Sequence, residues 1–315
     1  MSANSNTVIL AGSNSRNLAN SIGEINNLPV LQHKVIHFIN SEIKITLPFQ
    51  LDKNSIVWVV QSTSLPANTN LMELFLIIDT LKTAGVEEIN LIIPYFGYAR
   101  QDKQHLPGEC LSMSMISKIF KGLGVNKIMT CDIHNADVLD DMSLVVEDIS
   151  TLKVLAKKIY KDLGLNAETE KDFVIASPDQ GGVFRAELFA KNFFVDSDNY
   201  SFVSVKKERE LSKVHYSQAV ELYGEINRPK LILIDDISTS GGTIFNAIEL
   251  IKANNIEEIY TVIVHADFAS GVIEKFENSE IKKLYTTNTI EKPLDRLEYF
   301  DKVKVFDIAE SINLS

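Results

Sequence analysis

Residues 231–243 read L-I-L-I-D-D-I-S-T-S-G-G-T, and this stretch decides which fold the chain is expected to adopt. Apolar β-forming residues followed by polar ones are typical of a buried parallel strand, and α/β sheets bind ligands at the carboxyl ends of such strands. Gly241 and Gly242 let the backbone approach a phosphate closely, and a helix beginning near Thr243 would offer free N–H groups. The stretch therefore predicts a strand, a phosphate-binding turn and a helix.

The side chains of this turn predict the kind of ligand. Asp235 and Asp236 would repel a phosphate, so we expect them to accept hydrogen bonds from sugar hydroxyls or to hold a cation bound to phosphates. A phosphorylated sugar with a metal ion fits these groups, and an Asp-rich turn that only caps a helix is the alternative interpretation. Hydroxyl donors follow the acids at Ser238, Thr239, Ser240 and Thr243.

Length and composition indicate a two-domain globular protein. The chain has 315 residues, which exceeds the ~250 at which single cores stop growing. Its formal net charge of −11 argues against general nucleic-acid binding, because such binding needs a basic surface. A small anionic ligand stays compatible with this charge, since a local cluster of Lys and Arg can outweigh distant acids.

The cysteines and the N-terminal residues bear on location. Cys110 and Cys131 are too few for a disulfide framework and belong to no metal-ligand pair, so we expect reduced thiols. Residues 1–7 are polar and lack the features of a signal peptide, and no apolar run approaches the ~18 residues of a membrane span. These features predict a cytoplasmic protein that does not associate with membranes.

A weak internal repeat divides the sequence. Residues 81–89 (L-K-T-A-G-V-E-E-I) resemble residues 251–259 (I-K-A-N-N-I-E-E-I), and both read as a helix end, a turn and the start of a strand. The repeat favours two halves derived from one α/β unit, and generic likeness between such units is the alternative. Further pairs are residues 8–13 with 174–179, 57–64 with 231–238, and Val125 with Ile281.

Alternating strands and helices predict an α/β fold with a mainly parallel sheet, flanked by helices, in each half. We expect the boundary near residue 150, so that the domains span 1–150 and 151–300. Residues 301–315 read as a strand and a helix and are candidates for packing back on the first domain. The turn at 61–70, the first-half counterpart of the acidic loop, has neither acids nor glycine and is a poor phosphate site.

Residues 94–103 (P-Y-F-G-Y-A-R-Q-D-K) also follow an expected strand. Tyr95, Phe96 and Tyr98 offer stacking surfaces, and Arg100 with Lys103 can pair with phosphates, so the loop fits a nucleotide. An aromatic loop buried at a domain or subunit contact is an equally good interpretation of the composition.

Two short motifs contain candidate metal ligands. Asp132 and His134 share a face if their strand continues through them, and the pair could then bind a divalent cation. The motif S-P-D-Q-G-G at 177–182 would present Asp179 to a cleft beside free amides, with Arg185 reaching back one turn. A satisfied surface pair and an ordinary strand-to-helix turn are the alternatives.

The cationic run V-K-K-E-R-E at 205–210 lies upstream of the acidic loop. Lys207 and Arg209 would point the same way in an extended loop, which suits cations that close over phosphates. Runs of this kind are usually solvated surface, and that interpretation stays open.

Taken together and in this order, the motifs resemble those of the ribose-phosphate diphosphokinases, or phosphoribosyl-pyrophosphate synthetases, over nearly the whole chain. The resemblance implies two similar phosphoribosyltransferase-like domains. It also implies transfer of the β,γ-diphosphoryl group of ATP to the C1 hydroxyl of ribose 5-phosphate, for nucleotide biosynthesis. The motifs that carry it are A-G-S-N-S (11–15), F-I-N-S-E (38–42), 61–74, 94–102, D-I-H (132–134), S-P-D-Q-G-G and D-D-I-S-T-S-G-G-T.

The matching positions imply roles for individual residues. Mg²⁺ would be the cofactor, organised by His134 and Asp179 with support from Asp132, and Lys207 and Arg209 would stabilise charge on the transferring group. A homo-oligomer is implied as well, either a dimer or a hexamer built from dimers. ATP would be bound by Phe38, Asn40, Ser41, Glu42, Arg100 and Gln101. Ribose 5-phosphate would be bound by Asp235, Asp236, Thr239, Ser240, Gly241, Gly242 and Thr243.

Several residues depart from the family pattern. Asn40 and Ser41 replace an acid and a glycine in the adenine-contact segment, Thr239 replaces an aspartate, and Glu208 separates the two loop cations. These changes leave a second hypothesis open, namely a regulatory or assembly subunit with weak catalysis. A phosphoribosyltransferase is a third, although it leaves the ATP-type motifs of the first half unexplained.

Overall fold

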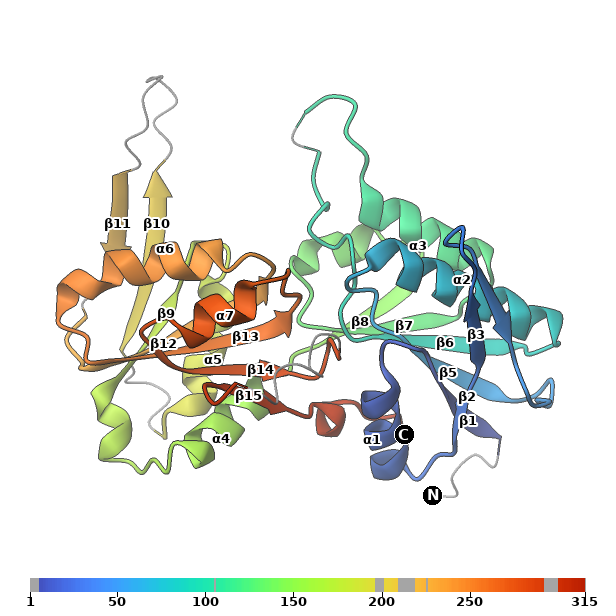
Figure 1. The fold of residues 1–315 in the computed structure, drawn as a ribbon, viewed down its shortest axis with the longest axis horizontal. Coiled ribbons are helices and arrows are strands. Elements are labelled where there is room, and N and C mark those ends of the chain that lie inside the picture. Colours follow the sequence, from blue (N-terminus) through green and yellow to red (C-terminus); the bar gives the residue numbers. More distant parts are fainter. Residues whose placement is uncertain are drawn as a thin grey trace. The chain divides into compact units, whose positions relative to one another are not determined.

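The computed structural model describes residues 6–104, 106–195, 201–208, 219–224, 226–291 and 300–314. The chain forms two compact units, shown in Figure 1. Unit 1 comprises Met1–Ser150, Asn288–Lys292 and Asp307–Ser315. Unit 2 comprises Thr151–Thr287 and Pro293–Phe306.

Unit 1 is built on a six-stranded sheet in the order β2-β1-β5-β6-β7-β8, in which every neighbouring pair is parallel. A separate antiparallel hairpin consists of β3 (Lys34–His37) and β4 (Ile43–Thr46). The sheet strands are β1 (Thr7–Ala11), β2 (Val30–Gln32), β5 (Ile56–Val60), β6 (Glu88–Ile93), β7 (Lys127–Cys131) and β8 (Val145–Ile149). The helices are α1 (Arg16–Asn26), α2 (Ala67–Thr83), α3 (Ser112–Gly122) and the short η1 (Ala136–Asp141).

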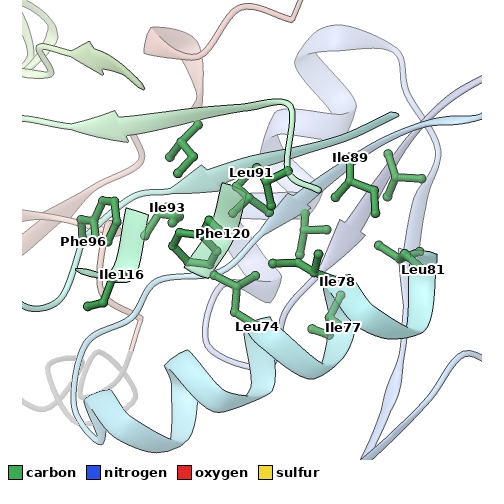
Figure 2. Packing of buried hydrophobic residues seen from close by; sticks show 14 of the residues in the cluster. Leu74, Ile77, Ile78, Leu81, Ile89, Leu91, Ile93, Phe96, Ile116 and Phe120 are labelled. Carbon is green, nitrogen blue, oxygen red and sulfur yellow. The ribbon is translucent and has the colours of Figure 1, made fainter. Parts of the chain in front are cut away.

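Helices cover both faces of this sheet, because alternate strand residues are apolar on each side. On one face, α2 and α3 pack on β5 and β6, and Figure 2 shows the interlocking side chains of this cluster. On the other face, α1 and the short η4 (Ala309–Ser311) pack against residues such as Ile9 and Trp58. The last residues of the chain therefore belong to the core of unit 1.

Unit 2 has a seven-stranded sheet in the order β11-β10-β9-β12-β13-β14-β15, parallel except for the pair β10 and β11. Its strands are β9 (Phe173–Ser177), β10 (Phe202–Glu208), β11 (Ala219–Tyr223), β12 (Lys230–Ser238), β13 (Glu258–Ala266), β14 (Ile281–Thr287) and β15 (Val303–Phe306). Its helices are α4 (Leu152–Asp162), α5 (Val183–Phe193), α6 (Gly242–Ile251), α7 (Val272–Glu277), η2 (Thr169–Asp172) and η3 (Lys252–Asn254). The pair α6 and α7 covers one face, and α4 and α5 cover the other.

The two sheets repeat the same strand order. The run β1-β5-β6-β7-β8 corresponds to β9-β12-β13-β14-β15, and in both runs a helix follows each of the first three strands, namely α1, α2 and α3 in unit 1 and α5, α6 and α7 in unit 2. The expected α/β fold of two similar domains, each with a mainly parallel sheet flanked by helices, is confirmed. Within residues 301–315, the strand belongs to unit 2, and only a short 3-10 turn forms where a helix was expected.

A charged cluster ties α4 to the edge of the unit 2 sheet. Asp162 accepts hydrogen bonds from Lys283 and Tyr285, each at 2.9 Å, and from Lys304. Burial alone would raise the pKa of Asp162, but these hydrogen bonds hold it at about 2. The cluster is structural, because all its members connect secondary-structure elements of one unit.

Among the described helices, none combines the length and apolar composition that a membrane crossing requires.

Candidate functional site

The turn between β12 and α6 exposes backbone and hydroxyl groups. Gly241 has a φ of 76°, and a Cβ there would lie 2.7 Å from the ring of Phe245, so glycine is required. Ala269 N–H donates to the carbonyl of Thr239 at 2.9 Å, which fixes the start of the turn. Ser240 and Gly242 are exposed, and the first amides of α6 have no partner within the helix. The turn can therefore bind a phosphate through N–H and O–H donors.

The two acids of the motif point to opposite faces of the sheet. Along β12, residues on the face of α6 and α7 alternate with residues on the face of α4 and α5, and Asp235 and Asp236 continue this alternation. Asp236 pairs with Arg185 of α5, with Oδ2 and Nη2 2.8 Å apart. Asp235 accepts from the backbone N–H of Asp236 at 3.0 Å. The sequence analysis gave Asp235 and Asp236 the same role, but the structure places their carboxylates in different surroundings.

Burial and neighbouring carboxylates raise the pKa of Asp235 well above its usual value. Burial is the largest cause, followed by the charge of Asp236 and, more weakly, that of Asp179. An added cation would lower this pKa, and a sugar hydroxyl could donate to the carboxylate. This corner of unit 2 therefore favours a ligand with hydroxyl groups or an associated cation.

Asp179 lies on the turn between β9 and α5, beside the same acids. Its Oδ1 accepts from Gly182 N–H at 3.0 Å, and its carbonyl accepts from Ser177 Oγ at 2.5 Å. Arg185 Nη1 donates to the carbonyl of Gly181 at 3.2 Å, so the arginine reaches back one turn as expected. The half-buried carboxylate of Asp179 is thus held in place at a strand's carboxyl end.

The cationic run lies partly in a strand. β10 includes Lys207, which pairs with Val220 of β11, where the sequence analysis expected an extended loop. The expectation of a loop was wrong at this residue because the antiparallel partner extends the strand. Arg209 lies outside the described residues.

In unit 1, the tip of the β3–β4 hairpin holds four of the expected ATP-binding residues. Phe38 N–H donates to the carbonyl of Glu42 at 2.8 Å, and Glu42 N–H donates to Asn40 Oδ1 at 3.2 Å. Ser41 has a φ of 70°, a left-handed conformation that glycine adopts without strain and serine does not. All four side chains are exposed, including 48% of Phe38, so the tip offers a ring and polar groups to a ligand.

The second expected ATP segment follows β6. Gly97 N–H donates to Thr63 Oγ1 at 2.7 Å, and Gln101 accepts from Ser112. Arg100 is exposed. In the part of the chain that the structure describes, no hydrogen bond or ion pair joins this segment to the hairpin tip. The expected stacking role of Phe96 is wrong, because its ring is buried against Phe120 in the core.

Asp132 and His134 do not share a strand face. β7 ends at Cys131, and Asp132 has a φ of 39°, so the alternation that the sequence analysis assumed stops there. Asp132 is buried and accepts from Ser150 Oγ at 2.9 Å, whereas His134 is exposed. Within the described ranges, no group of three or more His, Cys, Asp or Glu side chains could hold a metal ion.

The sequence analysis missed one buried pair of titratable side chains in unit 1. His33, between β2 and β3, lies with its Nε2 3.1 Å from Oε1 of Glu73 on α2. The available signal was the spacing on α2, where Asn70 and Glu73 fall among the apolar residues of the buried face, such as Ile77. An acid at such a position needs a buried partner.

Comparisons with known proteins agree with this architecture. A family model described as the N-terminal domain of ribose phosphate pyrophosphokinase matches residues 7–124, and one for a phosphoribosyl transferase domain matches residues 145–295. A ribose-phosphate pyrophosphokinase of Fusobacterium nucleatum subsp. nucleatum is 31% identical over 303 residues, covering 96% of this chain and 92% of the relative. Ribose-phosphate pyrophosphokinase 1 of Streptococcus agalactiae serotype III is 30% identical, covering 98% and 92%. The fold is shared with a crystal structure of phosphoribosylpyrophosphate synthetase from Mycobacterium smegmatis, with a TM-score of 0.84 and 24% identity over 97% of this chain and 95% of that one.

Proposed function

Because the chain belongs to the ribose-phosphate pyrophosphokinase family, we propose that it transfers the β,γ-diphosphoryl group of ATP to the C1 hydroxyl of ribose 5-phosphate. The products are AMP and phosphoribosyl pyrophosphate. The observation that carries the proposal is the turn after β12, where exposed N–H and O–H donors lie directly beyond two buried acids. A sugar phosphate has the matching groups, with a phosphate at one end and hydroxyls at the other.

The ribose 5-phosphate site combines the turn with one acid in particular. Thr239, Ser240, Gly241, Gly242 and Thr243 bind the phosphate through backbone amides and hydroxyls. Asp235 accepts from the sugar hydroxyls, because its carboxylate lies on the face of the sheet that carries α6. Asp236 supports the structure of the site and does not contact the sugar directly, since its carboxylate is paired with Arg185.

The ATP site draws on the exposed groups of unit 1. Phe38 stacks on the adenine, while Asn40, Ser41 and Glu42 contact polar edges of the nucleotide. Arg100 pairs with phosphate oxygens, and Gln101 is oriented by its hydrogen bond from Ser112. Lys207 and Arg209 stabilise charge on the transferring group, because diphosphoryl transfer depends on positioning and electrostatics more than on a covalent nucleophile.

Mg²⁺ is the cofactor that fits the donor set. Mg²⁺ usually retains several waters and takes only one or two carboxylates from a protein, so a dense cluster of protein ligands is not required. Asp179 suits this role because one oxygen is held by Gly182 N–H while the side chain stays partly exposed. His134 and Asp132 are the ligands proposed from unit 1. When bound to the phosphates, the ion makes the β-phosphorus a better electrophile.

The test is a product assay with a matched variant. Incubation with ATP, Mg²⁺ and ribose 5-phosphate is expected to give AMP and phosphoribosyl pyrophosphate in equal amounts. Lys207→Ala is expected to lower turnover by orders of magnitude and to leave ATP binding largely intact. No AMP under varied metal and phosphate concentrations would contradict the proposed activity.

A regulatory or assembly subunit with weak catalysis is the second candidate. Ser41 favours it, because a serine in the left-handed conformation strains the tip where the family has glycine. A ribose-dependent AMP signal that disappears in Lys207→Ala would exclude it. For either candidate we propose a homo-oligomer, a dimer or a hexamer built from dimers, in the cytoplasm.

A further inference from the structure

A buried pair of a histidine and a glutamate in unit 1 takes no part in the proposed chemistry. The side chains of His33 and Glu73 are 0% and 1% exposed, and His33 Nε2 lies 3.1 Å from Glu73 Oε1. A carboxylate is rarely buried in this way unless neighbouring groups compensate it, since its removal from water is costly. The pair is therefore expected to have a specific task.

Glu73 joins α2 to the loop after β1. Ser13 donates to its carboxylate twice, from the backbone N–H at 2.8 Å and from Oγ at 2.5 Å. Burial raises the pKa of Glu73, but the contacts with His33 and Ser13 outweigh burial and hold it below its usual value. The carboxylate is thus fixed by the two donors of Ser13, has the His33 ring beside it and stays ionised at neutral pH.

His33 is the single residue between β2, the edge strand of the main sheet, and β3, the first strand of the hairpin. Its Nδ1 lies 3.1 Å from the carbonyl of Ala11 at the end of β1. Each ring nitrogen therefore lies near an oxygen: Nδ1 is within hydrogen-bond distance of a carbonyl, and Nε2 lies close to the carboxylate without the geometry of a hydrogen bond. The ring joins the base of β3 to β1 and to α2.

The hairpin depends on such attachments. β3 and β4 form a two-stranded sheet of their own, without ladder hydrogen bonds to the main sheet, and isolated two-stranded hairpins are marginally stable. Ile45 attaches β4 to the apolar cluster under α2. His33 is the matching attachment for β3, whose other side chains are exposed or half-buried.

We propose that His33 and Glu73 form a positioning pair that anchors the β3–β4 hairpin to the body of unit 1 and so sets the placement of its nucleotide-binding tip. The pair touches no substrate, and its effect on nucleotide affinity rests on the proposed function. Loss of either member leaves the other buried without its partner and loosens the base of β3. The tip residues Phe38 to Glu42 then spend less time in the conformation that binds ATP.

The test uses shape-conserving variants. Glu73→Gln and His33→Gln are made singly and together, and Ser117→Ala is the matched control. Ser117 is also fully buried in unit 1 and loses a hydrogen bond, from Ser143 N–H, that does not involve the hairpin. If His33→Gln does not fold, Ser13→Ala replaces it, because Ser13 holds the same carboxylate.

Hydrogen exchange of residues 34–46 is the readout that needs no ligand. We expect at least fivefold faster exchange of the hairpin amides in each single variant, no further increase in the double variant, and wild-type exchange in Ser117→Ala. Three results would each overturn the proposed anchoring role. They are wild-type exchange in a folded Glu73→Gln variant, the same acceleration in Ser117→Ala, and additive effects in the double variant.

Calorimetric titration with ATP and Mg²⁺, without ribose 5-phosphate, measures the consequence. The Kd and the KM for ATP are expected to rise at least fivefold in both single variants, while kcat and the KM for ribose 5-phosphate change less than twofold. An unchanged Kd beside faster exchange would overturn the link between anchor and affinity. A wild-type protein that binds no ATP would contradict the proposed function instead, and the exchange experiment would still decide the anchor.

Discussion

Replacing Arg185 by methionine is expected to destabilise unit 2 strongly, because it removes the guanidinium that compensates a buried carboxylate. Arg185 and Asp236 lie 2.8 Å apart with side chains 12% and 6% exposed. Breaking a buried pair by removing one partner costs about 3–5 kcal/mol. Methionine keeps the apolar stem of the arginine, so the loss is mainly electrostatic.

The size of the loss depends on pH. Without the guanidinium, Asp236 lies beside Asp235, and its pKa in the folded protein is expected to rise above the unfolded value. A raised carboxyl pKa destabilises the folded state above that pKa, and the penalty disappears as the pH falls and the group takes up a proton. We therefore expect the variant's free energy of unfolding to be about 3 kcal/mol below that of the wild type at pH 8. This difference should decrease by up to ~1.4 kcal/mol for each pH unit between pH 8 and pH 5.

Differential scanning calorimetry between pH 5 and pH 8 measures this loss, and a domain of this size should melt roughly 6–12 °C lower at pH 8. The emission of Trp58, the one tryptophan of the chain, follows unit 1 separately. Lys171→Met is the control, since Lys171 and Glu168 are 60% and 83% exposed and their pair is worth little. A loss below about 1 kcal/mol at pH 8, or a loss independent of pH, would refute the reasoning.

Three further substitutions test local geometry. Asp162→Asn should cost about 1–2 kcal/mol at pH 7, after allowance for solvent screening of its lysine partners. Because the pKa of Asp162 is lowered to about 2, urea titrations should show this difference vanishing as the pH falls from about 4 to about 2. Gly241→Ala should destabilise unit 2 by about 2 kcal/mol or more and raise the KM for ribose 5-phosphate, since its Cβ would meet the Phe245 ring; an unchanged KM would contradict our account of the turn. Ser41→Gly should raise thermal stability by about 0.5–1 kcal/mol because it relieves a positive φ, and lower stability would show that Ser41 is unstrained.

The sequence was sufficient to predict the parts of the fold that depend on nearby residues. The turn after β12 can be recognised from thirteen consecutive residues, and the repeated helix–turn–strand junction at 81–89 and 251–259 is equally local. Residues 81–89 contain the end of α2 and the start of β6, and residues 251–259 contain the end of α6 and the start of β13. Strand order within each unit follows from such junctions, because successive parallel strands need helical crossovers.

What the sequence could not predict is set by contacts between distant residues and by single backbone angles. The prediction that Asp132 and His134 share a strand face was wrong because one residue, Asp132, adopts a positive φ and ends the alternation. Lys207 lies in a strand because a partner strand pairs with it. The pairing of Arg185 with Asp236 joins residues far apart in sequence, and no local pattern distinguishes Asp236 from Asp235.

The two equivalent turns show why only one half of the duplicated fold is suited to a sugar phosphate. In unit 2, Ser240 and Gly242 leave the turn after β12 open to solvent. In unit 1, the residues after β5 are enclosed by the protein itself. Asn14 donates to the carbonyl of Ser62 at 3.2 Å and to Ser64 Oγ at 2.8 Å, and its own N–H donates to Gln61 at 3.0 Å.

These buried amide and hydroxyl groups occupy the place that a ligand would need in the first half, and they hydrogen-bond to one another. Ser13, next to Asn14, continues the same network to Glu73 and His33. At the corresponding end of its sheet, the first half therefore has a buried polar core where the second half has an open turn. That core is where a hairpin without ladder bonds to the sheet can be held firmly enough to present a nucleotide-binding tip.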